Sequence, residues 1–344
     1  MGHGGDRRAR LVPELGPSRA PADLRGPPLR ARRLTPGELV DRLSALHVAI
    51  DDLRVERGAV PVADYYAETR PSGIAVLRGR GVAGYGECVA WTPTEQAEFA
   101  AACDRLELPS DPTVGTLSGF LTQELDDPYH RAAVEGAAID LALRQADTNP
   151  FALAGAPARP VAFCRSLGNT DEPLAAIAEV LARDPRARIK IDVPAEGWPA
   201  PTWEALAATR RIVVLDFKRG ADPDQVRLAH AAIPEAWLED PPEEAVTLDP
   251  RGEWREWVAL DGYVLAAVDL DDPEIPPAAI NVKAPRLGGW LEALRCLEEC
   301  RHRGLHAYVG GMFEVGPGRL QSRVLASLFT ADAWNDVAPI SGAL

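Results

Sequence analysis

The sequence predicts an α/β protein in which a closed barrel of alternating strands and helices follows a smaller α+β domain. Beyond Asn149-Pro150, short apolar segments alternate with helical segments in about seven units, a rhythm typical of a parallel sheet. Units this numerous and this equal in length favour a closed barrel over an open sheet. The part of the chain before Asn149 instead places strands first and helices after them, which is typical of an α+β domain.

Composition limits the class of protein. The 344 residues are 46% hydrophobic and 26% charged, enough for one large core or two smaller ones. Acidic residues outnumber basic ones 51 to 37, a net charge of −14, which argues against nucleic acid or an anionic membrane as the main partner. No segment approaches the roughly 20 apolar residues of a membrane-spanning helix. Five scattered cysteines favour a reducing compartment, so we expect a cytoplasmic protein.

The elements expected before the barrel fall into two stretches. Residues 1–35 are rich in Arg and Pro and lack an apolar core, so we expect a disordered extension rather than a secretory signal. Residues 36–150 should form the α+β domain, with strands over 48–57, 73–79 and 83–91 and helices over 94–106 and 130–147. The last helix carries an apolar stripe formed by Val134, Ala138, Leu141 and Ala142.

The barrel is expected over residues 151–330. Its predicted strands cover 160–167, 188–193, 212–217, 236–239, 258–260, 279–283 and 306–309, and its helices include segments near 174–182 and 319–329. Residues 331–344 are expected to return towards the first domain. No GxGxxG motif follows a strand, so dinucleotide binding has little support. Gly310-Gly311 and Gly316-x-Gly318, after the strand at 306–309, either close around an anion or make a tight turn.

Lysine is rare in this chain. Only three of the 37 basic residues are lysines, namely Lys190, Lys218 and Lys283. A GC-rich genome would produce such a bias, but arginine replaces lysine poorly where a compact, deprotonatable amine is needed. Each of the three lies at the carboxyl end of a predicted barrel strand, and residues at that end point into the active site of such barrels. The three lysines therefore indicate where the site lies.

Charged residues occupy the ends of five consecutive strands. In chain order they are Lys190 with Asp192, Asp216 with Lys218, Glu239 with Asp240, Asp261, and Lys283. Carboxylates on neighbouring strands are oxygen ligands suited to Mg²⁺, and lysines on either side can act as bases. Such a site would remove a proton from the carbon next to a carboxylate and hold the resulting enediolate on the metal. Ion-paired strand ends beneath surface loops are the alternative.

Three motifs carry a family resemblance over roughly residues 48–340. They are the stretches Trp237-Leu-Glu-Asp-Pro241, Ile280-Asn-Val-Lys-Ala-Pro-Arg-Leu-Gly-Gly289 and Gly310-Gly-Met-Phe-Glu-Val-Gly-Pro-Gly-Arg319, supported by Gly84-Tyr-Gly-Glu87 and the helix over 130–147. With them the chain resembles the enolase superfamily, in its branch of muconate cycloisomerases and o-succinylbenzoate synthases.

The resemblance implies a fold and an activity. The fold is a (β/α)7β TIM-like barrel under an N-terminal α+β capping domain. The activity is that of a lyase or isomerase (cycloisomerase, dehydratase or racemase) acting on a small carboxylate through a metal-stabilised enediolate. By position, Asp216, Glu239 and Asp261 would hold Mg²⁺, and lysines after the second and sixth strands would transfer the proton. Lys283 matches the sixth strand well, and homo-oligomers are common in the family.

The second strand departs from the family pattern, which usually reads Lys-x-Lys with the second lysine as the base. One alignment is Arg188-x-Lys190, which keeps a lysine at the base position. The other is Lys190-x-Asp192, which puts an acid there. We favour Lys190 as the base and keep Asp192 as a rival base or as a carboxylate that tunes the lysine.

The third strand departs as well, because Lys218 stands where the family has an asparagine. Its ammonium could lower Mg²⁺ affinity beside Asp216, contact the substrate carboxylate, or pair with Asp240. These departures motivate a competing hypothesis: a divergent barrel without the usual metal-dependent chemistry, acting as a binding protein or a metal-free enzyme. Aldolase chemistry on a phosphate-ester substrate, through a lysine Schiff base, is a weaker third hypothesis.

Further polar residues are candidates near the site. Glu314, after the strand at 306–309, and Ser166, at the end of the first barrel strand, are possible substrate contacts. The segment 60–70, with Tyr65 and Tyr66, lies where family members place a specificity loop. Asp269, Asp271 and Asp272 are rival acids that more plausibly form a solvated face.

Overall fold

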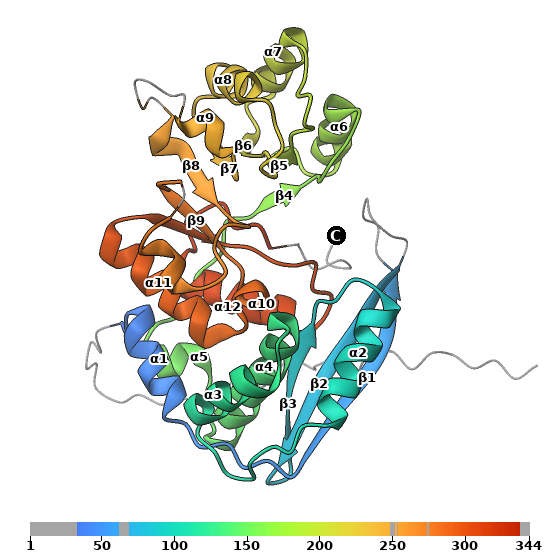
Figure 1. Cartoon of the computed structure of the whole chain (residues 1–344), viewed down its shortest axis with the longest axis vertical. Helices are drawn as coiled ribbons and strands as arrows, with labels where there is room; N and C mark the ends of the chain where they lie inside the picture. Colours follow the sequence, from blue (N-terminus) through green and yellow to red (C-terminus); the bar gives the residue numbers. More distant parts are fainter. Residues whose placement is uncertain (1–32, 62–68, 248–251, 253, 274, 338–344) are drawn as a thin grey trace, which may run out of the picture. The chain divides into compact units, whose positions relative to one another are not determined.

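The computed structural model describes residues 33–61, 69–247, 252, 254–273 and 275–337. Within these ranges, residues 33–154 form a cap, shown in blue and green in Figure 1. Its antiparallel sheet contains the strands β1 (Asp52–Pro61), β2 (Thr69–Gly79) and β3 (Val82–Cys88). Its helices are α1 (Pro36–Ser44), α2 (Pro93–Asp104), α3 (Val114–Glu124), α4 (Pro128–Gln145) and α5 (Pro150–Ala154).

Local sequence explains where the cap helices begin. The side chains of Thr35 and Thr92 each accept the backbone N–H of the glutamate three residues on, and the side chain of that glutamate accepts the backbone N–H of the threonine. This arrangement is a capping box, which satisfies two backbone donors at the start of the helix. Thr35 therefore belongs to the folded cap. Asp127 caps α4 without a capping box, by accepting the N–H of Tyr129 at 2.7 Å. The helix predicted from residue 130 thus begins two residues earlier.

Helix α3 was not predicted from the sequence. Its segment VGTLSGFLTQE contains two glycines and several Ser and Thr residues, which have low helix propensity. Burial overrides this preference, because Val114, Leu117 and Leu121 lie on one face and are each about 1% exposed. Packing against the rest of the cap core therefore decides this helix.

Two glycines of β3 explain how closely the cap strand and α4 pack. A Cβ on Gly84 would lie 2.2 Å from the carbonyl oxygen of Ala137, and one on Gly86 would lie 1.9 Å from that of Ala133. Only glycine permits this approach of a strand to a helix backbone. The Gly84-Tyr-Gly-Glu87 motif therefore fixes β3 directly against α4.

The barrel follows with seven parallel strands in chain order. They are β4 (Cys164–Ser166), β5 (Arg188–Asp192), β6 (Ile212–Asp216), β7 (Trp237–Glu239), β8 (Val258–Leu260), β9 (Ala279–Val282) and β10 (His306–Val309). The helices are α6 (Pro173–Arg183), α7 (Ala200–Thr209), α8 (Pro223–Ala232), α9 (Glu243–Thr247), α10 (Ala284–Leu287), α11 (Trp290–Arg303) and α12 (Pro317–Phe329), with 3₁₀ turns η1 (Arg255–Trp257) and η2 (Ala267–Leu270). The predicted α/β barrel with an N-terminal α+β domain is confirmed.

The barrel closes through the segment after α12. Asn335 makes a parallel bridge to Phe163, just before β4, and Asp336 makes one to Gly310, just after β10. These bridges link the two outer strands of the seven-stranded sheet. Within the described part of residues 331–344, which ends at Val337, Asn335 and Asp336 pair with the barrel edges; the return of this segment towards the cap stays a prediction.

Two large hydrophobic cores support the fold. One joins the cap helices to β8, β9, β10, α10, α11 and α12, and includes Leu141, Ile280 and Leu294. The other lies between β5–β7 and the helices α6–α8, and includes Ile191, Leu215 and Trp203. The first half of the barrel therefore has a core of its own, whereas the second half shares its core with the cap.

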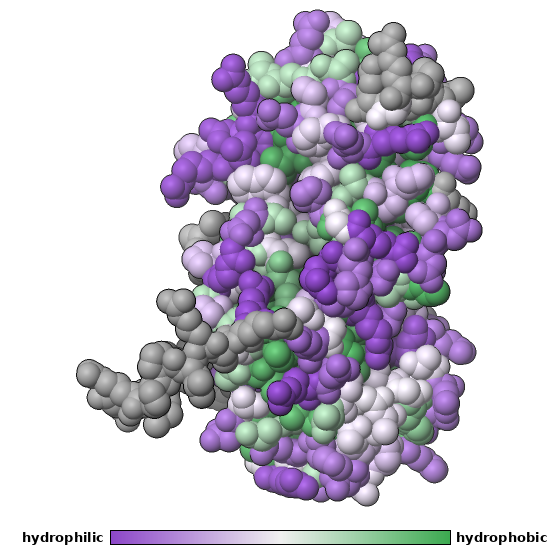
Figure 2. Space-filling view, turned by 90° about the vertical axis from the view of Figure 1, so that its left-hand side faces the viewer, coloured by the Kyte–Doolittle hydropathy of each residue, from purple (hydrophilic) through white to green (hydrophobic). Residues whose placement is uncertain are grey.

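The surface and the cysteines agree with a well-buried core. Figure 2 shows one face, mostly hydrophilic with small separate apolar areas. The five cysteines are buried and unpaired. Among the described residues, no helix is both long and apolar enough to cross a membrane.

Candidate active site

Three buried carboxylates meet at the carboxyl ends of neighbouring barrel strands. Asp216 ends β6, Glu239 ends β7 and Asp261 follows β8. One oxygen of each lies within 4.8 Å of the others, and all three residues are buried. Parallel register brings them together, because Asp216 pairs with Glu239 across β6 and β7. The sequence-predicted carboxylates therefore form one cluster.

Lys190 lies beneath this cluster and is 2% exposed. Its Nζ is 2.5 Å from Glu239 Oε1, 3.0 Å from Asp216 Oδ2 and 3.0 Å from Asp336 Oδ2. Burial alone would lower the pKa of Lys190, but these three carboxylates outweigh it and raise the pKa well above its usual value. Lys190 is therefore a protonated ammonium within the cluster.

Lys218 lies on the solvent side of the same carboxylates. Its Nζ contacts Asp216 Oδ2 directly and lies 3.6 Å from Asp192 Oδ1. The backbone of Lys218 is left-handed, with φ of 50°, and its N–H donates to Asp216 Oδ1 at 3.2 Å. The predicted alternative of a pair with Asp240 is wrong, since Asp240 accepts the backbone N–H groups of Asp261 and Gly262 at 2.7 and 2.8 Å.

Asp192 lies next to Asp216 across the β5–β6 pairing. Its side chain is 10% exposed. Burial raises the pKa of Asp192 above its usual value, although Lys218 opposes that rise. The register thus puts Asp192, and not Lys190, level with Asp216 at the end of the second barrel strand.

Lys283 and Arg286 hold the third carboxylate. Lys283 follows β9, and its Nζ is 2.9 Å from Asp261 Oδ2. Arg286, on α10, contacts the other oxygen of Asp261. Burial would raise the pKa of Asp261, but the two cations lower it well below its usual range. Because β5 and β9 are separated by three strands in the sheet, Lys190 and Lys283 approach the cluster from opposite sides.

Neutral donors complete the surroundings of Glu239. Tyr308 Oη donates to Glu239 Oε2 at 2.6 Å, and the Asn281 amide lies 3.4 Å from both carboxylate oxygens. Burial and the neighbouring carboxylates Asp216 and Asp261 raise the pKa of Glu239 to about 8, against the effect of Lys190. By contrast, Lys190 and Lys218 overcome burial at Asp216 and lower its pKa to about 2.

The donor set fits a single hard divalent cation. Carboxylate oxygens are the ligands that Mg²⁺ and Ca²⁺ prefer, and three oxygens within 4.8 Å of one another can reach one ion at the usual metal–oxygen distances of about 2.0–2.6 Å. The cluster also provides four cations of its own, so any metal must compete with ammonium and guanidinium groups for the same oxygens.

The loop after β10 is shaped by packing on these residues. A Cβ on Gly310 would lie 2.2 Å from Asn281 Oδ1 and 2.6 Å from Lys283 Cε, so only glycine leaves room for Lys283. Glu314 is 2% exposed and accepts the N–H of Met312 at 2.9 Å and the Ser322 hydroxyl at 3.4 Å. Glu314 thus stabilises the loop through hydrogen bonds to the loop and to α12. Its contact with substrate stays a prediction.

The segment with Gly316 and Gly318 does bind an anion through its backbone N–H groups, and this anion is a side-chain carboxylate of the protein itself. The carboxylate of Glu87, on β3 of the cap, accepts the N–H groups of Val315, Gly316 and Gly318 at 2.7, 2.8 and 3.1 Å. These donors lie at the amino end of α12, where a carboxylate is favoured by the exposed N–H groups and the helix dipole. Glu87 therefore ties the cap to the loop that follows β10.

A second cap carboxylate holds the neighbouring loop. Glu135, on α4, accepts the N–H of Leu291 at 3.1 Å, at the amino end of α11, and the Ser118 hydroxyl at 2.5 Å.

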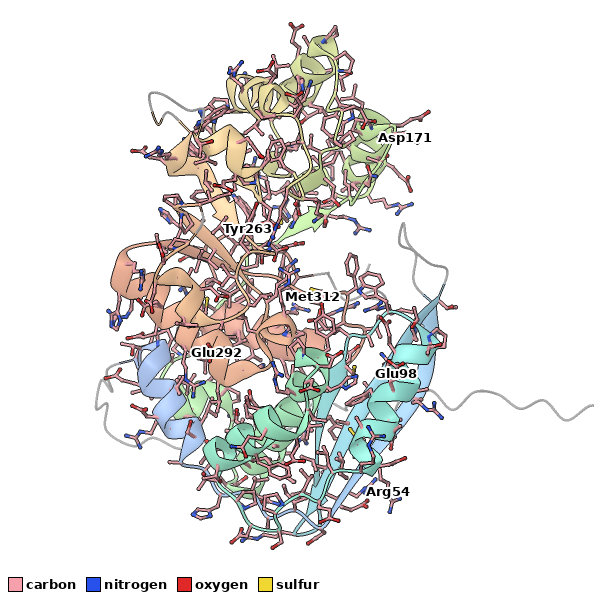
Figure 3. The ribbon with its side chains drawn as sticks, in the orientation of Figure 1. Arg54, Glu98, Asp171, Tyr263, Glu292 and Met312 are labelled. Atoms are coloured by element: carbon pink, nitrogen blue, oxygen red, sulfur yellow. The ribbon has the colours of Figure 1, made fainter. Side chains whose placement is uncertain are left out.

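Met312, labelled in Figure 3, lies between the two domains. Its carbonyl accepts from Arg70 of the cap at 3.2 Å, and its Sδ lies 3.7 Å from Arg286.

The remaining predicted residues lie around this centre or outside the described ranges. Ser166 ends β4 opposite Lys190. Asp269 caps η2 by accepting the N–H groups of Leu265 and Ala266, and Asp271 pairs with Arg303 on the exterior, so these acids are not part of the cluster. Tyr65 and Tyr66 lie outside the described residues.

Four residues that contact the centre were not predicted as members of it: Asn281, Arg286, Tyr308 and Asp336. Asn281 lies two residues before Lys283 and Tyr308 two before Gly310, so strand alternation could have found them. Arg286 follows Lys283 by one helical turn. No sequence pattern marks Asp336 as part of the centre, because it reaches Lys190 only when the segment after α12 closes the barrel.

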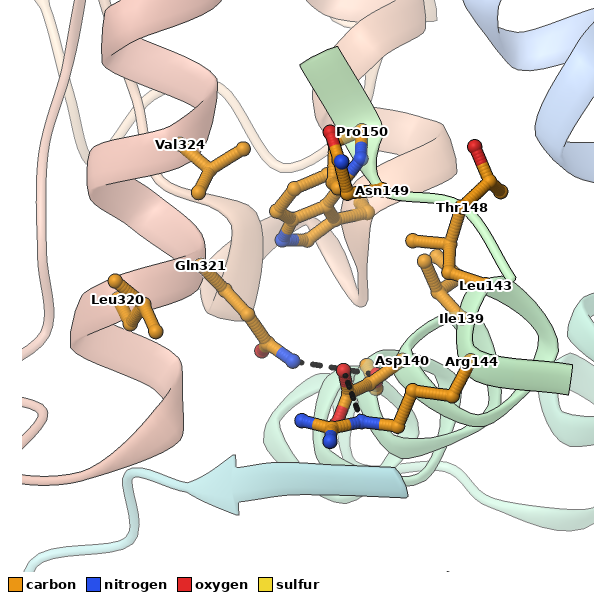
Figure 4. Close-up of a pocket in the computed structure, with 12 residues that line it drawn as sticks. Ile139, Asp140, Leu143, Arg144, Thr148, Asn149, Pro150, Leu320, Gln321 and Val324 are labelled. Carbon is orange, nitrogen blue, oxygen red and sulfur yellow. Dashed lines mark hydrogen bonds and ion pairs between the residues drawn. The ribbon is translucent and has the colours of Figure 1, made fainter. Parts of the chain in front are cut away.

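Two cavities of the described structure lie outside the carboxylate cluster. One, of about 330 Å³, lies between α4 and α12 and is lined by Ile139, Leu320 and Gln321 among others (Figure 4). The other, of about 290 Å³, is lined by Arg219, Gly262 and Tyr263. None of the cluster carboxylates or lysines lines either cavity.

Comparison with protein families identifies relatives for most of the chain. A family described as "Domain of unknown function (DUF8230)" matches in two parts, its N-terminal domain over residues 41–152 and its C-terminal domain over residues 157–341. The chain belongs to this family. The two matched domains coincide with the cap and the barrel of the structure.

Curated relatives match only a short part of the DUF8230 chain. An N-succinylamino acid racemase from Amycolatopsis is 39% identical over 70 residues, 20% of this chain and 17% of that protein. An o-succinylbenzoate synthase from Enterococcus faecalis is 40% identical over 60 residues, 17% of this chain and 16% of that protein. The chain thus aligns with about a sixth of the length of these relatives.

Solved structures match most of the chain. A protein from Enterococcus faecalis, described as an unknown member of the enolase superfamily, is 23% identical, with a TM-score of 0.67 over 85% of this chain and 86% of that one. A dipeptide epimerase from Methylococcus capsulatus, solved with Mg and the dipeptide L-Arg-D-Lys, is 21% identical, with a TM-score of 0.69 over 84% and 90%. The predicted resemblance in fold to enolase-superfamily proteins is thereby confirmed.

Proposed function

We propose that this protein is an enzyme that removes the proton next to the carboxylate of a small molecule, as a lyase, cycloisomerase or racemase. One observation carries the proposal: Asp216, Glu239 and Asp261, from three neighbouring strands, converge within 4.8 Å and are flanked by lysines from opposite sides of the barrel. Relatives named as a racemase and a synthase, and a structural neighbour named as an epimerase, support this reaction class.

The residues have separate tasks in this proposal. Asp216, Glu239 and Asp261 would hold Mg²⁺, which when bound would supply positive charge against the negative charge that develops on the substrate. Lys283 would take the proton, because it lies at the end of its strand beside the cluster. Lys190, protonated and on the opposite side, would return a proton or act as a fixed positive charge. Asp192 is the rival for this second proton transfer, since its side chain is more exposed than that of Lys190.

Proton exchange tests the proposal directly. The protein would be incubated with Mg²⁺ in D₂O with a panel of N-succinyl amino acids, dipeptides and other small carboxylates, and NMR would follow deuterium at the carbon next to the carboxylate. We expect exchange with a member of the panel, and its loss in Lys283→Ala with the fold retained. Arg183→Ala, on the exterior helix α6, is the control. Exchange that survives in Lys283→Ala would overturn the role of Lys283.

A metal-free or purely binding role is the second candidate. It is favoured by the observation that each cluster carboxylate already contacts a cation of the protein: Lys190 at Glu239, Lys218 at Asp216 and Lys283 at Asp261. Calorimetry with MgCl₂ separates the two. Magnesium binding that is lost in Asp216→Asn supports the first proposal, and the absence of binding in the wild type favours the second.

A further inference from the structure

The four cations around the carboxylates differ in their exposure. The side chain of Lys190 is 2% exposed, that of Lys283 8% and that of Arg286 17%, whereas that of Lys218 is 53% exposed. A buried ammonium cannot leave its carboxylates without a large desolvation penalty for the charges left behind. Lys218 is therefore the cation of this set that can move at low cost.

Lys218 also has a second carboxylate within reach. Its Nζ contacts Asp216 and lies 3.6 Å from Asp192 Oδ1. Within the described residues, the salt bridges of Asp192 are limited to this one with Lys218. The left-handed backbone at Lys218, with φ of 50°, turns the side chain back over the end of β6, so a rotation about side-chain bonds is enough to carry the ammonium from one acid to the other.

A divalent cation at Asp216 would compete for a carboxylate that Lys218 contacts at both oxygens, at Oδ2 through its ammonium and at Oδ1 through its backbone N–H. It would also add two positive charges to a cluster that already contains four basic groups, which is unfavourable unless one of them withdraws. We infer that Lys218 is an internal competitor for the cation site: its ammonium holds Asp216 in the metal-free protein and transfers to Asp192 when a divalent cation binds. The inference rests on the proposed cation site, and it adds a residue that sets the affinity of that site.

Competition of this kind has a defined thermodynamic consequence. A site available for only a fraction of the time binds with its intrinsic affinity reduced by that fraction. Removing Lys218 should therefore tighten Mg²⁺ binding, whereas removing the charge of Asp192 should weaken it, because the displaced ammonium then has no partner. The effect of Asp192 should vanish once Lys218 is gone, which a double-mutant cycle measures.

The experiment is calorimetric titration of the metal-free full chain with MgCl₂. Lys218→Gly keeps the left-handed backbone without strain, and we expect it to bind at least tenfold more tightly. We expect Asp192→Asn to bind about fivefold more weakly and the double variant to match Lys218→Gly. Arg219→Gly is the matched control, because Arg219 is a neighbouring left-handed cation whose guanidinium lies 3.4 Å from the Tyr263 ring centroid; we expect it to bind as the wild type does.

A second readout follows the ammonium itself. The chain has three lysines, so lysine labelled with ¹³C gives three Cε signals, and the signal lost in Lys218→Gly identifies Lys218. On addition of Mg²⁺ we expect the Lys218 signal to shift, and the shift to change in Asp192→Asn.

Four outcomes overturn the inference, the last of them together with the proposed cation site. Equal affinities of Lys218→Gly and the wild type would exclude competition while leaving the cation site intact. An undiminished effect of Asp192→Asn in the Lys218→Gly background would show that Asp192 acts through its own charge. Equal tightening in Arg219→Gly would indicate a general effect of charge. If no variant binds Mg²⁺, the proposed cation site fails together with the inference.

Discussion

The two halves of the barrel hold their side of the site in different ways. The half with β8–β10 shares a hydrophobic core with the cap, and two buried cap carboxylates, Glu87 and Glu135, accept backbone N–H groups at the starts of α12 and α11. The half with β5–β7 has its own core. There the exposed end of the site is held by the side-chain charges of Asp192, Asp216 and Lys218.

From this contrast we infer that one part of the centre is fixed and the other can adjust. Lys283 lies between loops whose backbones are tied to the cap, so its amine is positioned by packing, as its close contact with Gly310 shows. Lys218 lies on a left-handed backbone followed by Arg219, with φ of 50° and 64°. Non-glycine residues in this region carry strain that tends to collect at functional sites. The cap-supported half is thus pre-organised, and the other half is adaptable.

The largest effect should come from the ammonium that joins the two halves. In Lys190→Met, three carboxylates lose a buried partner, and breaking such a pair costs about 3–5 kcal/mol. Urea unfolding measures this loss. The control Arg183→Ala breaks an exposed pair with Glu179 and should cost less than about 0.5 kcal/mol. Similar midpoints for the two variants would contradict the view of Lys190 as an essential counter-charge.

The next effect is a dependence of stability on pH that arises from the cap-supported half. Burial raises the pKa of Glu87 from 4.5 to about 7, and the nearby Glu314 adds to this, while three backbone N–H groups and the adjacent Arg319 oppose it. The folded protein therefore binds a proton more tightly than the unfolded chain does. The protonated Glu87 contributes about 3 kcal/mol to the free energy of unfolding. This contribution is fully present below pH 4.5 and is lost as the pH rises to about 7.

Urea unfolding at a series of pH values checks this dependence. In Glu87→Gln, the fall in unfolding free energy between pH 4.5 and 7 should shrink by roughly that amount, because the amide does not titrate. Glu95→Gln, an exposed capping acid on α2, is the control and should keep the fall. An unchanged slope in Glu87→Gln would contradict the assignment.

A smaller effect is expected at the second cap carboxylate. Glu135→Ala leaves the N–H of Leu291 without its acceptor, and a buried unsatisfied donor costs about 1–3 kcal/mol. Hydrogen exchange should accelerate at the start of α11 while the centre of α7, in the other half, keeps its protection. Equal acceleration in both helices would mean that the two halves respond as one unit.

The smallest effect should come from the adaptable half. Lys218→Gly removes a half-exposed ion pair but also relieves a left-handed backbone, and these opposing terms should leave the unfolding free energy within about 1 kcal/mol of the wild type. The same urea titration as for Lys190 measures it. A loss comparable to that of Lys190→Met would show that Lys218 is as firmly built in as the buried lysine.

Much of the barrel was predictable because its strands are buried runs between clear breakers. The strands at 258–260 and 306–309 were placed with their observed bounds, and the spacing of Asp216, Glu239 and Asp261 located the cluster. Helix α3 could not be predicted from its own residues, because only burial against the cap stabilises it. Glu87 lay within a recognised motif, but its contact with α12 spans more than 200 residues and leaves no local pattern.

The residue pattern alone predicts the repeat of the barrel, the position of its three lysines and the acids at the strand ends, because a strand period of two and a unit of about 22–26 residues repeat along the chain. Which of these charges meet depends on the folded chain. It brought Asp336 to Lys190 by closing the barrel, placed Asp192 level with Asp216, and turned Lys218 to Asp216 rather than to Asp240. Ion pairs depend on distances of a few ångströms between segments far apart in the chain, and only the folded backbone sets those distances.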